Sequence, residues 1–558
     1  MSMNEKSPEY EYSKVPTKPL ITDNPEKPPP YGYGVRHIQL LIFFFCLSVN
    51  FIARGHMGVT VVAMTSPSVH KSVLDINTTE IDYSVNNTVP LNGQNMTENN
   101  IDDETAGNIS IDEVVMDTNQ SYSTYDWPKS TQEMVLGSFF LGYGIMTFPM
   151  GMVVQRWGGK IPMQIALFIN GIVSILAPWL INWGSWKAVC ACRIAQGLSQ
   201  AGVYPSIQNL LAKWVPVSER GSLTSYVYTG STIGTVLGFQ LSGVLSETKW
   251  GWPSAFWAVG LICLAFFLLL TIFGAASPAN HKNISDDEKN YILGRIDDGK
   301  VRRHKIPWKA IMTSRPMWGA LASHVGAGTT FVFYFTQVPS YIHYILGINV
   351  KSSGLLSSLP YLVSFFTSIA FGTISDFLTN RKIVSVKNAR RIFNSISQVG
   401  IAISLICASY TTSTVIAVLC LVCAMGCHMA IHVGWMVSTL INKTYWGTAI
   451  KLPKIKVNHI DLAPNFSGTL MTLGNTLTNI GTVLLPVLVS HVVTDMKNQI
   501  QWRIMFFTVA AVTLTTNALF VLLVSADTQP WNDLEQHDTA LENVETEQKT
   551  DNKEKQEK

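Results

Sequence analysis

Twelve long apolar segments dominate this chain and constrain its fold more than any other feature. Each approaches or exceeds about 20 residues, the length that a helix needs to cross the hydrocarbon core of a membrane. The segments are continuously apolar rather than alternating, so we expect helices and not a β-barrel. Their approximate spans are 38–65, 131–155, 161–181, 187–213, 222–246, 254–276, 317–345, 352–378, 393–411, 413–441, 466–492 and 502–525.

Charged residues are scarce and segregated. They make up 14% of the 558 residues, against roughly 25% in a typical soluble domain. They gather in the two tails, the loops and one central stretch. The formal net charge of +3 also lacks the basic excess that marks a nucleic-acid-binding surface. These observations exclude a soluble enzyme and a nucleic-acid binder, and they predict a chain embedded in a lipid bilayer.

A polar stretch at 277–316 divides the spans into six and six, which predicts two six-helix halves at 35–276 and 317–525. Within this central loop, Ser285-Asp286-Asp287-Glu288 indicates a short capped surface helix. Two halves around one loop are typical of carriers that bind their substrate near the bilayer midplane. The flanking stretches 1–34 and 526–558 are polar and are predicted to be disordered tails.

The charge distribution and the sequons predict the same orientation. Lys and Arg are concentrated in the tails, the central loop and the alternate short loops, which places these segments and both termini in the cytosol. The loop 66–130 lies on the opposite side and carries five N-glycosylation sequons, although an Asn/Thr-rich loop without sugars is the alternative interpretation. The sequon residues are Asn77, Asn86, Asn95, Asn108 and Asn119.

Several motifs identify a family resemblance. The segment Gly151 to Lys160 resembles the major facilitator loop motif after the second helix, with Gln155 in place of the usual acidic residue. More specific motifs are Leu136-Gly-Ser-Phe-Phe-Leu-Gly-Tyr143, Arg193-Ile-Ala-Gln-Gly-Leu-Ser-Gln200-Ala-Gly-Val-Tyr-Pro205, Lys213-Trp-Val-Pro-Val-Ser-Glu-Arg220, Trp252-Pro-Ser-Ala-Phe-Trp257, Gly354-Leu-Leu-Ser-Ser-Leu-Pro360-Tyr and Val457-Asn-His-Ile-Asp-Leu-Ala-Pro464. Together they resemble the anion–cation symporter family of the major facilitator superfamily. That family contains sialin, the vesicular glutamate transporters and the type I sodium/phosphate cotransporters.

The resemblance implies an all-α membrane protein with the twelve-helix major facilitator fold. Independently of it, Arg54 and Arg193 are ionisable residues inside predicted spans, where charge is expensive and usually functional. A guanidinium offers a fork of donors that matches carboxylate or phosphate, so both are candidate substrate-binding residues. Capping of backbone carbonyls or snorkelling to the interface is the alternative. In the resembled family both positions are arginines implicated in anion binding or gating.

Three further residues complete the candidate site. Tyr143 is a candidate to present its hydroxyl to the substrate, with simple packing as the alternative. Gln200 stands where the proton-coupled relatives have a glutamate, and Gln196 is also neutral. Glutamine cannot titrate, so we assign these two residues to coupling or gating and favour sodium over a proton as the co-transported ion. Ala327 and Leu136 replace an arginine and a histidine of the vesicular glutamate carriers, which disfavours glutamate as the substrate.

Three segments carry weaker signals. Pro28-Pro-Pro-Tyr31 fits the PPxY pattern that WW domains bind, with a Pro-rich tail as the alternative. Residues 442–456 interrupt the family pattern and are either a genuine insertion or a gene-model artefact. The group Cys420, Cys423, Cys427 and His428 superficially suggests metal ligands, but small apolar positions on a membrane helix explain it better. We therefore expect no metal site and no cofactor, with sodium only as a co-transported ion.

The prediction is a secondary active transporter of small anions, specifically a sodium-coupled symporter of inorganic phosphate that works by alternating access. One alternative is a carrier of sialate, urate or acidic amino acids, driven by a proton gradient or the membrane potential. Another is a sensor that binds an anion without transporting it. No enzymatic activity is expected, because the polar segments carry no nucleophile–base pair. The expected location is the plasma membrane or an endomembrane vesicle.

Overall fold

The structure is a computed structural model, and it describes residues 33–65, 122–216, 220–293, 307–411, 413–431 and 467–525. Several sequence predictions fall outside these residues and are not tested. They are the five sequons (Asn77, Asn86, Asn95, Asn108 and Asn119), the Pro28–Tyr31 motif, the insertion at 442–456 and nearly all of both tails.

The described residues form helices and contain no strand. The N-terminal half consists of α1 (Val35–Thr65), α3 (Lys129–Trp157), α4 (Lys160–Gln200), α5 (Val203–Trp214), α6 (Arg220–Ser246) and α7 (Gly251–Phe273). The central segment contributes η2 (Pro278–Asn280), α8 (Asp286–Leu293) and α9 (Trp308–Thr313). The C-terminal half consists of α10 (Arg315–Thr336), α11 (Val338–Tyr344), α12 (Val350–Asn380), α13 (Val386–Tyr410), α14 (Thr414–His428), α17 (Ser467–Val492) and α18 (Gln499–Leu523).

These helices account for all twelve predicted spans. Eight continuous helices are long and apolar enough to cross a membrane, and one of them, Lys160–Trp214, covers two predicted spans. Its two parts meet at Ser185, whose φ of 50° departs from helical geometry. The remaining three spans correspond to α6, to α10 with α11, and to α14. The chain is therefore a multi-pass, all-α membrane protein, as predicted.

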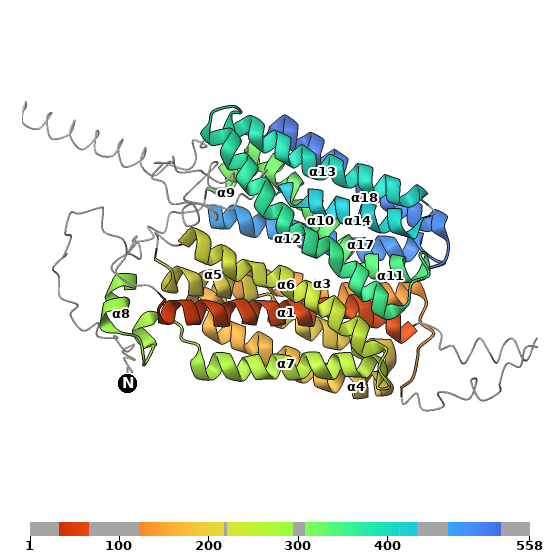
Figure 1. The fold of residues 1–558 in the computed structure, drawn as a ribbon, viewed down its shortest axis with the longest axis horizontal. Coiled ribbons are helices and arrows are strands. Elements are labelled where there is room, and N and C mark those ends of the chain that lie inside the picture. The colour runs from red at the N-terminus through yellow and green to blue at the C-terminus, as the bar shows by residue number, and fades with distance from the viewer. Residues whose placement is uncertain are drawn as a thin grey trace, which may run out of the picture.

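The helices form two bundles that lie side by side along their length (Figure 1). The helices α1 to α7 form one bundle, and α10 to α18 form the other. Across the junction, α6 packs on α12 and α3 packs on α17. We call the end at which α8 lies the inner end, and the opposite end, at which α11 lies, the outer end. The outer end is the one that the sequence predicts to face the lumen or the extracellular space.

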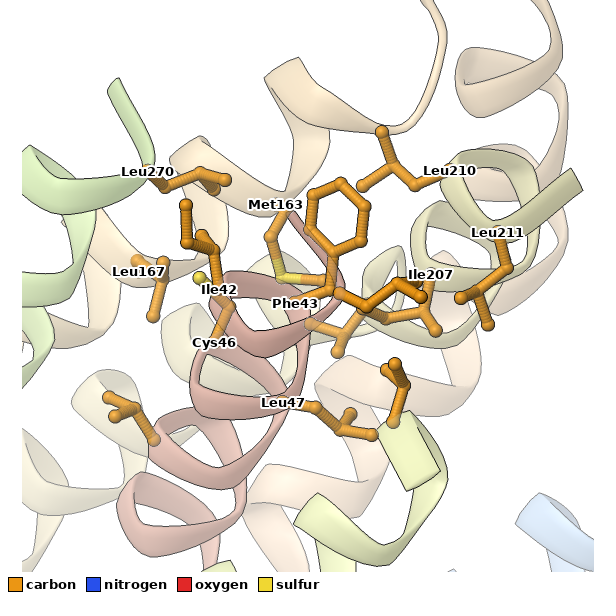
Figure 2. Packing of buried hydrophobic residues seen from close by; sticks show 14 of the residues in the cluster. Ile42, Phe43, Cys46, Leu47, Met163, Leu167, Ile207, Leu210, Leu211 and Leu270 are labelled. Atoms are coloured by element: carbon orange, nitrogen blue, oxygen red, sulfur yellow. The ribbon is translucent and has the colours of Figure 1, made fainter. Parts of the chain in front are cut away.

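The most buried helix is α1, which lies at the centre of the N-terminal bundle. Figure 2 shows Ile42 and Cys46 of this helix facing Leu167 of α4 and Leu270 of α7, while Phe43 faces Ile207 of α5. A helix that is apolar on nearly all sides is expected to be surrounded by other helices in this way. Polar side chains in the middle of α1, such as Asn50 and Arg54, are consequently held inside the protein and away from lipid.

Glycines on α6 allow it to pack closely against α1. Gly230, Gly234 and Gly238 are spaced by four residues, so they share one face of the helix. A Cβ added at Gly234 would collide with the backbone carbonyl of Ser48 on α1. This small-residue face permits close approach of the two backbones.

The central helix α8 is attached more firmly than the predicted surface helix. The carboxylate of Glu288 accepts hydrogen bonds from the backbone N–H groups of Val35 and Arg36, each at 3.0 Å, at the N-terminus of α1. It also pairs with the Arg36 guanidinium at 3.3 Å. A carboxylate at a helix N-terminus satisfies free donors and is favoured by the helix dipole. The buried Ile292 completes the attachment of α8 to the N-terminal half.

Substitution of Gly234 by alanine is expected to lower the free energy of unfolding by about 1–3 kcal/mol, the usual range for overpacking. The physical reason is the steric conflict with Ser48 on α1. Gly372→Ala is the matched control, because a Cβ at Gly372 meets nothing within 4 Å. Thermal or denaturant unfolding in nanodiscs, followed by intrinsic fluorescence, measures both variants. Equal stability of the two would contradict the close approach of α6 and α1.

Candidate functional site

The candidate site forms where α1, α3 and α4 meet. Two glycines bring α3 and the second part of α4 together: a Cβ at Gly142 would collide with the carbonyl of Ile194, and one at Gly197 with the carbonyl of Phe139. Because the backbones are so close, Phe139 and Tyr143 on α3 reach the residues that α1 and α4 contribute. The sequence motifs around both glycines therefore have a packing function that supports the site.

Arg54 of α1 is the central residue of this site. Its side chain is 7% exposed, and its Nε donates a hydrogen bond to Oε1 of Gln200 at 3.3 Å. Among the described residues, no carboxylate pairs with it and its two terminal nitrogens have no hydrogen-bond partner. Removal of a charge from water is expensive unless it gains a counter-charge. A bound anion would supply the missing partner.

Three aromatic rings surround the Arg54 guanidinium. Its Cζ lies 4.7 Å from the ring centroid of Phe51, 5.0 Å from that of Phe139 and 4.8 Å from that of Tyr143. Cation–π contacts of this kind offset part of the desolvation of the charge without neutralising it. Tyr143 thus lies beside Arg54, and its observed contact with that residue is made by the face of the ring; the predicted contact of its hydroxyl with a substrate stays a prediction.

Arg193 of α4 lies next to Arg54 but is used differently. Its side chain is 3% exposed. One terminal nitrogen donates to Oε1 of Gln196 at 3.0 Å and to the carbonyl of Ala53 at 3.4 Å, and the other donates to the carbonyl of Arg54 at 3.4 Å. Its Cζ also lies 4.7 Å from the Phe139 ring centroid. Arg193 therefore contributes positive charge while it holds α4 against the segment of α1 that carries Arg54.

A chain of uncharged side chains connects the two arginines to the interior of the bundle. Gln200 accepts from Arg54 and donates to Oδ1 of Asn170 at 2.9 Å. Asn170 donates to Ser199 at 3.3 Å, and Gln196 donates to Ser174 at 3.1 Å. Buried amides with both ends bonded hold their neighbours in fixed positions. None of these groups titrates in the physiological range.

The structure brings all five predicted site residues together: Arg54, Arg193, Tyr143, Gln196 and Gln200. Sequence reasoning missed Phe51, Phe139 and Asn170. Phe51 lies one helical turn before Arg54, and Phe139 lies one turn before Tyr143. Residues at this spacing share a helix face, and that pattern could have indicated that both rings belong to the site. Asn170 gave no signal, because only the tertiary fold brings it to Gln200.

The cysteines do not form a metal site in the part of the chain that the structure describes. Cys420, Cys423 and Cys427 have free thiols on α14. No group of three or more His, Cys, Asp and Glu side chains in the described ranges is arranged to hold a metal ion. Beside the two guanidinium groups, the centre of the bundle holds aromatic faces, neutral amides and the buried imidazole of His56, which lies two residues after Arg54 on α1.

Comparison with known proteins gives the same class as the fold and site, a membrane carrier built from two helical bundles. Residues 40–450 match the Major Facilitator Superfamily. A Drosophila melanogaster protein named "Putative inorganic phosphate cotransporter" is 29% identical over 516 residues, covering 91% of this chain and 88% of that protein. Human sialin is 30% identical over 414 residues, covering 74% of this chain and 79% of sialin.

A solved structure shows the same fold at low sequence identity. The bacterial homolog of the human lysosomal transporter Spinster, in an inward-facing and unoccupied conformation, has a TM-score of 0.61 and 13% identity. The match covers 90% of this chain and 100% of that structure. The chain belongs to the Major Facilitator Superfamily and, within it, to the anion–cation symporter family that its motifs resemble.

Arg54→Ala is expected to abolish anion uptake while glycosylation and membrane abundance stay normal. Hydrogen bonds to charged groups contribute about 1.5–3 kcal/mol each, so loss of two predicts a decrease in anion affinity of roughly a hundredfold or more. Uptake by proteoliposomes measures the effect. Arg381→Ala, at an exposed arginine at the C-terminal end of α12, is the control and should transport normally. Near-normal uptake by Arg54→Ala would remove this residue from the site.

Gln200→Glu is expected to make uptake depend on pH. A carboxylate at this position would pair with Arg54 and compete with the substrate anion, so uptake falls at neutral pH. Acidification protonates the carboxylate and restores the free guanidinium, so uptake rises as the pH decreases. Uptake at several pH values measures this profile, with Gln208→Glu at an exposed position of α5 as the control. A flat profile in the folded variant would contradict the contact between Gln200 and Arg54.

Proposed function

We propose that this protein is a secondary active transporter of small anions, with inorganic phosphate as the substrate and sodium as the coupling ion. The observation that carries the proposal is the buried Arg54 guanidinium, which has free terminal nitrogens and no carboxylate partner among the described residues. A guanidinium fork matches two oxygens of phosphate. Arg193 adds a second positive charge 3.4 Å from the Arg54 carbonyl.

The neutral hydrogen-bond network supports sodium rather than proton coupling. A proton-coupled carrier needs a group that binds and releases a proton near the substrate. The side chains that contact the two arginines and extend inward are instead Gln200, Gln196, Asn170, Ser174 and Ser199. Sodium is a hard cation that prefers oxygen ligands, and amide and hydroxyl oxygens are of that type. The name of the Drosophila melanogaster relative, "Putative inorganic phosphate cotransporter", agrees with this substrate.

A carrier of organic anions is the second candidate, and one observation favours it. The rings of Phe51, Phe139 and Tyr143 surround the guanidinium. An organic anion such as sialate, urate or an acidic amino acid would place its carboxylate on Arg54 and its carbon skeleton against these rings. Inorganic phosphate has no apolar part to use them. The similarity to sialin also fits this candidate.

The proposed orientation places α8 and both termini in the cytosol, in the plasma membrane or an endomembrane vesicle. The charge asymmetry of the sequence supports it, because the basic residues of the central loop flank α8. The site offers no nucleophile with an adjacent base, so we propose transport without an enzymatic reaction. The site also requires no cofactor for this activity.

The decisive experiment is uptake of radiolabelled phosphate into proteoliposomes, with an imposed inward sodium gradient or with potassium in its place. Saturable uptake that requires sodium is the expected result. Sodium-independent uptake of sialate, urate or an acidic amino acid under a pH or voltage gradient would instead establish the second candidate. Saturable binding of an anion by the folded protein without any flux would overturn transport altogether and indicate a sensor.

A further inference from the structure

A buried ion pair lies at the outer end of the bundle, apart from the substrate site. Lys129 and Glu133 stand one turn apart on α3, with Nζ and Oε1 separated by 2.7 Å. Their side chains are each 1% exposed. Lys129 falls within the loop that the sequence predicts at 66–130, and Glu133 falls near the start of the predicted span 131–155. Glu133 lies six residues before Phe139, which corresponds to roughly 9 Å along the helix.

One residue of the C-terminal half bonds to both charges. Gln337 lies at the break between α10 and α11, and its side chain is fully buried. Its Oε1 accepts a hydrogen bond from Nζ of Lys129 at 3.2 Å, and its Nε2 donates to Oε2 of Glu133 at 2.8 Å. The amide oxygen of Gln337 therefore binds the ammonium of Lys129, and its amide nitrogen binds the carboxylate of Glu133.

Other contacts between the halves surround this amide at the same end. The Trp502 ring of α18 lies 5.3 Å from Nζ of Lys129. Nε2 of Gln132 on α3 donates to Sδ of Met496 at 3.5 Å. The hydroxyls of Thr65 on α1 and Tyr344 on α11 are 3.0 Å apart. The two halves are thus joined by side-chain contacts at the outer end, where a carrier that works by alternating access would have its outer gate.

We propose that Lys129, Glu133 and Gln337 form a latch that holds the outer gate closed and opens during each transport cycle. This inference rests on the proposed alternating-access transport. When the halves separate at the outer end, Gln337 leaves both charges. Lys129 and Glu133 stay paired with each other, because both are on α3. They are positioning residues for the gate and do not contact the substrate.

The composition of the latch explains why the gate can still open. If the two halves contributed opposite charges, opening would separate a buried ion pair, which is strongly unfavourable. Here opening breaks hydrogen bonds from one neutral amide, and the charges keep their partner and gain water. Each hydrogen bond to a charged group shifts an equilibrium by roughly tenfold or more. The latch therefore favours the closed gate without making it permanent.

Hydrogen–deuterium exchange of the full-length protein in nanodiscs tests this proposal without any substrate, so its outcome is independent of which anion is transported. The variant is Gln337→Leu, which removes the amide and leaves the ion pair on α3. We expect faster exchange of the peptides around 125–135 and 336–346 at the outer end, and slower exchange around 307–318 at the inner end. Opposite changes at the two ends are the signature of a shift from one gate state to the other.

Two other outcomes would overturn the latch. Faster exchange at both ends would show that Gln337 only stabilises the fold, and unchanged exchange at both ends would show that it does not control the gate. Gln208→Leu, at an exposed position of α5, is the matched control and should leave both ends unchanged. Normal yield and thermal stability of Gln337→Leu confirm that the comparison is made on folded protein.

An exchange of the two charges provides an independent test. Lys129→Glu and Glu133→Lys, made singly, place like charges together, so each should lower turnover tenfold or more. The double variant restores opposite charges, and a rotation of the Gln337 amide by half a turn restores both hydrogen bonds. We expect the double variant to recover turnover and the parent exchange pattern at both ends. Recovery of stability with the outer end still open would contradict the bridging role of the amide.

Discussion

The rest of this structure depends on a guanidinium that is buried near the centre of a membrane bundle without a counter-charge among the described residues. An uncompensated charge in such a place is strongly unfavourable, so the surrounding fold has to stabilise it partially. Three aromatic faces and one amide oxygen do so at Arg54. A carboxylate in their place would neutralise the residue fully and leave it nothing to bind. The partial compensation is what makes the position useful for a carrier that must bind its anion and release it again.

This arrangement requires backbones that approach unusually closely. Gly142 and Gly197 bring α3 against α4, and Gly234 brings α6 against α1. If these helices were held apart by even one methyl group, Phe139 would move away from both arginines. Arg193 adds a second constraint, because it donates to the carbonyls of Ala53 and Arg54. The residues that set the helix packing therefore also determine where the charged group lies.

The sequence predicted the helical halves and the identity of the central residues, because both depend on local properties. Long apolar runs set the spans, and charges within them, such as Arg54 and Arg193, stand out against that background. The roles within the site depended on tertiary contacts and could not be predicted. The capping alternative considered for both arginines describes the contacts of Arg193, whereas Arg54 keeps its terminal nitrogens free. Lys129 and Glu133 were missed because they lie at the end of a span, where charges are common, and only the fold shows that they are buried.

The buried charges at the centre of the bundle and those at its outer end obey different physical requirements. In the proposed transport cycle the charge at the centre must exchange partners, and its observed protein contacts are accordingly neutral and leave it able to pair with an anion. The charges at the outer end must not attract the substrate, and Lys129 and Glu133 neutralise each other at 2.7 Å. Because Lys129 and Glu133 are already paired, the neutral amide of Gln337 is sufficient to connect them to the C-terminal half. A carrier that placed its unpaired charge at the gate and its paired charge at the centre would hold its substrate at the entrance and bind nothing at the midplane.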